Sequence, residues 1–219
     1  MSDFIKHECG VAFIRLLKPL AYYKEKYGDI HYGLTKMYLL MEKQHNRGQD
    51  GAGIATIKLD CQPGYRYYDR IRSVDSRAIK DIFETIFSQF SDLSDDELLA
   101  MNDMDYVKNQ YQFMGELLMG HLRYGTHGGN SMHNCHPRIR SNNWMTRTLF
   151  IAGNFNLTNV NDLFQNLVNL GQFPRELSDT MTVLEKIGHF LDVENQKQFK
   201  RFKSDGLDNI QITKLIGDH

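Results

Sequence analysis

The chain has 219 residues, of which 41% are hydrophobic and 24% are charged, and its formal net charge is -1. A chain of this length can bury one substantial core, and the near balance of charges argues against a general nucleic-acid binder. No apolar run is long enough to span a membrane, and residues 1–8 lack the apolar core of a signal peptide, so we expect neither a membrane partner nor secretion. The three cysteines are widely spaced and form no CxxC pair, which favours a reducing, cytoplasmic location.

Hydrophobic periodicity predicts a mixture of strands and helices along the chain. The expected strands are short apolar runs flanked by glycines or turn residues, at 9–17, 53–59, 65–71, 116–125 and 148–155. The expected helices, in which apolar residues recur every three or four positions, lie at 34–45, within 76–113 and at about 180–191. The basic run "KQFKRFK" (197–203) is expected to be a solvated helix face and not a nucleic-acid contact. This order of elements is compatible with several α+β folds.

Three polar segments at strand ends carry most of the chemical information. They are "NRGQDGAGIA" (46–55), "GHLRYGTHGGNSMHNCHP" (120–137) and "IAGNFNLTN" (151–159). Loops at strand ends often hold functional groups on a rigid scaffold. Each segment taken singly could also consist of turn-forming residues only.

Taken in order after the Cys-Gly pair at 9–10, these segments resemble the class II glutamine amidotransferases, whose glutaminase domains are N-terminal nucleophile hydrolases. The resemblance rests on "CGVAFI", "RGQDGAGIA", "GHLRYGTHG", "NCHP", "GNFNLTN" and "SDT", which run from Cys9 to Thr180. "RGQDGAGIA" and the "NLTN" ending are most similar to the amidophosphoribosyltransferases, whereas the hexosamine-forming relatives typically carry tyrosine at the position of Gln49.

The resemblance implies an α+β fold, the four-layer αββα sandwich of the N-terminal nucleophile hydrolases, incomplete at the C-terminus. Residues 1–8 would be a propeptide and 9–219 a truncated glutaminase domain, with peripheral insertions at about 17–33 and 76–113. A phosphoribosyltransferase domain, with which Mg²⁺ could associate, would be missing from this chain. We expect no cofactor in the chain itself, and three scattered cysteines give no place for an iron–sulfur cluster. The resemblance leaves open whether the protein forms a homo-oligomer.

The chemistry expected at Cys9 depends on removal of the residues before it. Cysteine thiols in general ionise near pH 8.5, so a nucleophilic cysteine needs a nearby base. Cleavage between Glu8 and Cys9 would create an α-amino group, a workable base near neutral pH, on the nucleophile itself. The alternative is that Cys9 is a small apolar side chain at the start of a core strand.

The implied substrate is L-glutamine, and the resemblance assigns the other roles. The Asn154 side chain and the Phe155 backbone N–H would stabilise the oxyanion, although many relatives carry glycine at the Phe155 position. Arg123 would bind the substrate α-carboxylate through its planar fork. Asp179 would bind the α-ammonium group, with helix capping as its alternative role.

Four further residues complete the expected site. The resemblance places Thr126 and His127 in the same pocket as Arg123. Arg47 and Asp50 would brace the loops around the nucleophile, as an internal ion pair or as supports for its amine.

Two other classes of function stay open at this stage. One is a catalytically silent scaffold that binds glutamine or regulates a partner while its leader stays uncleaved. The other is a zinc site, because five possible ligands crowd into sixteen residues: His121, His127, His133, Cys135 and His136. Their spacing fits no ligand pattern, and a strand would direct His121 away from the others.

Overall fold

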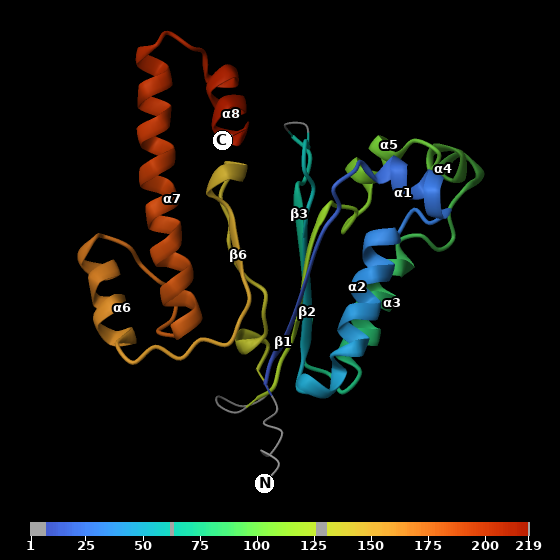
Figure 1. The fold of residues 1–219 in the computed structure, drawn as a ribbon, viewed down its shortest axis with the longest axis horizontal. Coiled ribbons are helices and arrows are strands. Elements are labelled where there is room, and N and C mark those ends of the chain that lie inside the picture. Colours follow the sequence, from blue (N-terminus) through green and yellow to red (C-terminus); the bar gives the residue numbers. More distant parts are fainter. Residues whose placement is uncertain (1–7, 62–63, 126–130, 219) are drawn as a thin grey trace. The chain divides into compact units, whose positions relative to one another are not determined.

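The computed structural model describes residues 8–61, 64–125 and 131–218. Its fold is α+β with antiparallel sheets (Figure 1). The chain forms two compact units, which we call the N-terminal unit (Met1–Pro137 and Ala152–Asn154) and the C-terminal unit (Arg138–Ile151 and Phe155–His219). The four-layer sandwich stays a prediction.

A four-stranded antiparallel sheet organises the N-terminal unit. Its strands lie in the order β1 (Gly10–Arg15), β4 (Leu117–Leu122), β2 (Ala52–Ile57) and β3 (Tyr68–Ser73). Gly10 and Ala52 both pair with Leu122. Because β1 and β2 begin where β4 ends, this register brings the residues before β1, before β2 and after β4 to one end of the sheet.

Two helices cover one face of this sheet. Helix α2 (Tyr32–Lys43) packs against β1 and β4, and α3 (Ala78–Ser88) packs against β2 and β3 (Figure 1). Each helix carries an apolar stripe at helical spacing, which supplies the driving force for packing. The buried members of the stripes are Leu34, Met37, Met41, Ile79, Ile82, Phe83 and Ile86. They form one core with Ile54, Leu118 and Leu122 of the strands.

Segment 76–113 contributes to this core. Ile82 and Ile86 of α3 are each 1% exposed, because their stripe lies on β2 and β3. Two shorter helices, α4 (Asp95–Ala100) and α5 (Met104–Gln110), complete the segment, and Val107 of α5 is also fully buried. Segment 17–33 contains α1 (Leu20–Tyr27), which buries Leu20. Whether either segment is an insertion relative to the resembling family stays a prediction.

The C-terminal unit is built around one long helix. Strands β5 (Arg138–Arg140) and β6 (Leu149–Ile151) pair antiparallel, and the helices are α6 (Val160–Asn169), α7 (Asp179–Ser204) and α8 (Asn209–Asp218). Ser178 caps α7, because its hydroxyl accepts the Met181 N–H at 3.3 Å. The basic run at 197–203 is the exposed last part of α7, as predicted. In the described parts of the chain, none of the helices combines the length and apolar character needed to span a bilayer.

Candidate active site

Cys9 lies at the end of the four-stranded sheet, immediately before β1. The Tyr124 N–H donates to the Cys9 sulfur at 3.5 Å, and the thiol lies 3.9 Å from the Tyr124 carbonyl oxygen. Cys9 is only half-buried. The environment of a core thiol belongs instead to Cys135, which is fully buried and donates to the Ala52 carbonyl at 3.1 Å. The alternative of a structural core cysteine therefore fits Cys135 better than Cys9.

The loop before β2 contacts the start of β1 closely. A Cβ added at Gly10 would lie 3.0 Å from the Gln44 side-chain oxygen and 3.5 Å from the Arg47 Cβ. Arg47 ends the short 3-10 helix His45–Arg47 that follows α2. The absence of a side chain at Gly10 thus allows this turn, with Arg47, to pack beside the Cys9 backbone.

Arg123 follows β4 and is almost fully buried. Its backbone N–H donates to the Gly51 carbonyl at 2.8 Å, and its own carbonyl accepts the Asp50 N–H at 3.0 Å. Its guanidinium donates to the Ser131 carbonyl at 3.2 Å. A Cβ at Gly48 would approach the Arg123 carbonyl carbon and oxygen to 2.6 Å, so this close contact requires glycine. The "RGQDG" loop is therefore fitted against the residue that precedes Tyr124.

Asp50 adds a side-chain contact to the same arrangement. Its carboxylate accepts the Gly125 N–H at 2.7 Å. This bond fixes the backbone two residues after Arg123, next to the Tyr124 peptide that contacts the Cys9 sulfur. Within the described residues Asp50 bonds this peptide and forms no ion pair with Arg47. The structure thus brings Cys9, Arg47, Asp50 and Arg123 to one end of one sheet.

Two buried histidines lie close to this end of the sheet. The rings of His121 and His136 are 4.7 Å apart, although a strand was expected to direct His121 away. The rings meet because the chain after Cys135 crosses over β2, where a Cβ at Gly53 would lie 2.0 Å from the His136 carbonyl oxygen. Burial, followed by the neighbouring His136 and Arg123, lowers the pKa of His121 to about 3. No local sequence pattern indicates this pair.

The loop after β6 carries the predicted oxyanion residues. The Gly153 N–H donates to His136 Nδ1 at 3.4 Å, and Asn154, the next residue, is exposed. Asn154 ends the N-terminal unit and Phe155 begins the second stretch of the C-terminal unit.

Asp179 opens α7 but is not its cap. Its carboxylate accepts the Leu157 N–H at 2.9 Å, while Ser178 supplies the capping oxygen. Asp179 therefore ties the start of α7 to the loop that follows Phe155. Asp179 belongs to the C-terminal unit and Cys9 to the N-terminal unit.

Two predicted site residues, Thr126 and His127, lie outside the described residues. Within the described ranges, no group of three or more His, Cys, Asp or Glu side chains is arranged to hold a metal ion. Cys135 directs its thiol to backbone carbonyls, which is a structural role.

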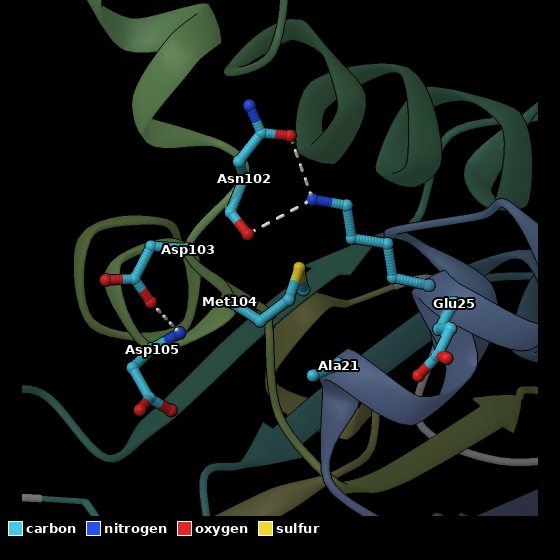
Figure 2. Close-up of a pocket in the computed structure, with 7 residues that line it drawn as sticks. Ala21, Glu25, Asn102, Asp103, Met104 and Asp105 are labelled. Atoms are coloured by element: carbon cyan, nitrogen blue, oxygen red, sulfur yellow. Dashed lines mark hydrogen bonds between the residues drawn. The ribbon is translucent and has the colours of Figure 1, made fainter.

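A cavity beside α1 contains none of the predicted site residues. Its volume is about 430 Å³, and its lining comes from α1, the turn before α5 and the first residues of α5 (Figure 2). Lys24 lines it and donates to the carbonyls of Met101 and Asn102 at 3.1 and 3.2 Å. These hydrogen bonds occupy the Lys24 ammonium group and the carbonyl groups that follow α4. Lys24 therefore has a structural role here.

Comparison with known proteins gives one distant similarity. No model of a known protein family matches the sequence. The chain is 26% identical over 182 residues to Amidophosphoribosyltransferase 2, chloroplastic, of Arabidopsis thaliana. The match covers 83% of this chain and 25% of that protein, so the chain spans about a quarter of the length of this relative. The similarity agrees with the resemblance that the motifs indicate.

Proposed function

We propose that this chain is the glutaminase part of a glutamine amidotransferase, which hydrolyses the side-chain amide of L-glutamine to glutamate and ammonia. The distant similarity to an amidophosphoribosyltransferase supports an enzyme of this kind. The observation that carries the proposal is the position of Cys9, with its half-buried sulfur against the Tyr124 N–H at the sheet end where Arg123 lies.

The proposed reaction begins with cleavage between Glu8 and Cys9. The liberated α-amino group takes the proton of the Cys9 thiol, and the thiolate attacks the amide carbon of glutamine. The tetrahedral intermediate then collapses to a glutamyl thioester. Ammonia leaves with the proton held by the α-ammonium group. Water, deprotonated by the same amine, hydrolyses the thioester to glutamate and the free thiol.

The proposed substrate contacts use groups of matching charge. Arg123 would bind the α-carboxylate of glutamine, and its burial makes that ion pair stronger than it would be in water. Asp179 would bind the α-ammonium group. A carboxylate has two oxygens, so Asp179 can keep its bond to the Leu157 N–H while the other oxygen accepts from substrate. Asn154 and the Phe155 N–H would stabilise the oxyanion.

The finer assignment is to an amidophosphoribosyltransferase-like enzyme of purine synthesis. In this proposal ammonia passes to a phosphoribosyltransferase domain outside the present chain. The glutaminase fold would be the αββα sandwich, and the antiparallel sheet with α2 and α3 on one face supplies two layers that such a fold requires.

The test is a chain that begins at Cys9, released by a protease from a leader placed directly before it. We expect this chain to release glutamate from glutamine, and Cys9→Ala to lower the rate by more than about 10³-fold. Cys61→Ala, at a half-exposed cysteine away from the site, is the matched control and should keep full activity.

Two outcomes would contradict the proposal. Unchanged activity in Cys9→Ala would remove the nucleophile. Binding of glutamine without hydrolysis by the chain that begins at Cys9 would instead support the non-catalytic scaffold.

A further inference from the structure

The C-terminal unit contains an open, surface-exposed cavity that takes no part in the proposed glutaminase reaction. Its volume is about 660 Å³, within the range of small-molecule sites. Its lining residues, all in the C-terminal unit, are Arg147, Gln172, His189, Asp192, Val193, Gln196, Lys197 and Lys200.

One face of α7 forms most of the lining. The α7 residues, from His189 to Lys200, follow one another at alternating steps of three and one, so they share one side of the helix. The basic run at 197–203 contributes Lys197 and Lys200 to this side. The cavity therefore gives a role to a basic segment that the proposed reaction leaves unused.

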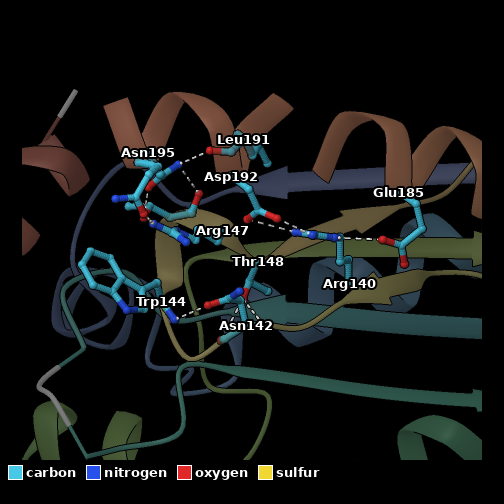
Figure 3. A network of polar contacts seen from close by, with 11 residues as sticks. Arg140, Asn142, Trp144, Arg147, Thr148, Glu185, Leu191, Asp192 and Asn195 are labelled. Carbon is cyan, nitrogen blue, oxygen red and sulfur yellow. Dashed lines mark hydrogen bonds and ion pairs between the residues drawn. The ribbon is translucent and has the colours of Figure 1, made fainter. Parts of the chain in front are cut away.

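Arg147, which ends the 3-10 helix Met145–Arg147, also lines the cavity and is held in place. Its guanidinium carbon lies 5.1 Å from the centre of the Trp144 ring (Figure 3). Its Nη2 donates to the Gln196 side chain at 3.5 Å. Its Nε is buried and has no hydrogen-bond partner in the described parts of the chain. Stacking on Trp144 holds the planar guanidinium in one orientation, and a fixed guanidinium can bind two oxygens of an anion at once.

The charge of the lining is positive. Its one carboxylate, Asp192, is neutralised by Arg140, whose two terminal nitrogens contact the two carboxylate oxygens at 3.3 and 2.5 Å (Figure 3). Lys197 lies 3.6 Å from Glu194, but both side chains are more than half exposed, so this pair is weak. Lys200 forms no ion pair within the described residues. Arg147 and the two lysines thus leave an excess of positive charge.

We propose that this cavity binds a small molecule that carries a phosphate or diphosphate group. The planar fork of Arg147 matches two oxygens of such a group, and Lys197 and Lys200 supply point charges for the others. Val193 offers an apolar contact for the rest of the molecule. A polyanion such as nucleic acid fits less well, because the cations gather around one cavity in a chain whose net charge is -1.

The test uses inorganic diphosphate as the probe and isothermal titration calorimetry with the whole chain. We expect binding, and a loss of affinity of about 10-fold or more in Lys200→Gln and in Arg147→Gln. The matched control is Lys203→Gln, which removes the same charge from an exposed position of α7 that does not line the cavity. It should change the affinity by less than about 2-fold.

Three results would overturn the proposal. The first is that diphosphate does not bind, and the second is that Lys203→Gln loses as much affinity for diphosphate as the other two variants. The third is that a single-stranded oligonucleotide binds the chain more tightly than diphosphate does, with an affinity that falls equally in all three variants. Lys200 is exposed, so its variant keeps the fold even if thermal unfolding shows that Arg147→Gln does not. Cys9→Ala should bind diphosphate with the same affinity as the unaltered chain. This comparison shows whether the phosphate site exists independently of the proposed glutaminase activity.

Discussion

Individual buried residues determine how the chain responds to pH. His121 is 1% exposed, and neither ring nitrogen has a hydrogen-bond partner among the described residues. Its folded-state pKa is about 3, whereas histidine in an unfolded chain titrates near 6.5. The unfolded chain therefore binds a proton that the folded chain excludes. This contribution to stability is fully present above pH 6.5 and is lost as the pH falls toward 3.

His121→Phe should flatten this part of the pH dependence. Between about pH 6 and pH 4, the free energy of unfolding of the unaltered chain should fall by about 1.4 kcal/mol per pH unit more than that of the variant. Urea unfolding of both chains over this range measures the difference. The packing cost of the larger phenylalanine ring shifts the free energy of unfolding equally at every pH, so it does not change the slope of that free energy against pH. Equal slopes in the two chains would show that His121 does not titrate as inferred.

The residues near Cys9 show what the sequence could predict about the site. The motif order predicted that Asp50 and Arg123 lie with Cys9, and their backbones do meet at one end of the sheet. It could not predict the His121–His136 contact or the buried role of Cys135. Both depend on how the chain after β4 crosses over β2, which no local pattern encodes.

At the scale of single elements, α7 is fixed to β5 by an arginine. Arg140 pairs with Glu185 at 3.0 Å and with Asp192, and all three side chains are largely buried (Figure 3). The hydrogen bond to Asp192, ahead of that to Glu185, raises the pKa of Arg140 above its usual value. A Cβ at Gly188 would lie 2.3 Å from the Arg140 side chain, so glycine leaves room for the guanidinium on this helix.

Arg140→Leu should leave two carboxylates partly buried without their cation. We expect the free energy of unfolding to fall by roughly 2–3 kcal/mol. Lys80→Leu is the matched control, because it breaks the exposed pair with Glu84 on α3 and should cost at most about 1 kcal/mol. Thermal unfolding of both variants measures this contrast, and equal losses would show that the Arg140 network adds no more than a surface pair.

The elements themselves were predicted unequally well. The apolar stripes predicted α2 and α3 correctly, because burial and periodicity agree there. Helix α7 was predicted to end near Leu191 but continues to Ser204, because contacts distant in sequence support its polar half. Asn195 in that half is buried and bonds the Thr146 side chain and carbonyl. Strand β5, three residues long, has too few residues for a periodic signal.

At the scale of the whole molecule, each compact unit has its own buried side chains. The N-terminal unit encloses the core under α2 and α3, and the C-terminal unit buries Leu167, Leu184 and Ile212 of its three helices. Composition predicted enough apolar residues for one substantial core, but it contains no information about how they divide between units. That division depends on which segments pair in space. Strands β5 and β6, for example, pair across an eight-residue connection that contains the 3-10 helix Met145–Arg147.

The reaction proposed for the chain is the production of ammonia from glutamine. If thioester formation at Cys9 releases ammonia before water enters, ammonia should appear ahead of glutamate in the first turnover of a chain that begins at Cys9, without any added acceptor. Rapid-quench samples assayed separately for ammonia and glutamate measure this order, and Cys9→Ala gives the background. Release of the two products at the same rate in the first turnover would contradict an accumulating thioester. An absolute requirement for an acceptor would show that the glutaminase site becomes active only with the synthase part of a longer enzyme.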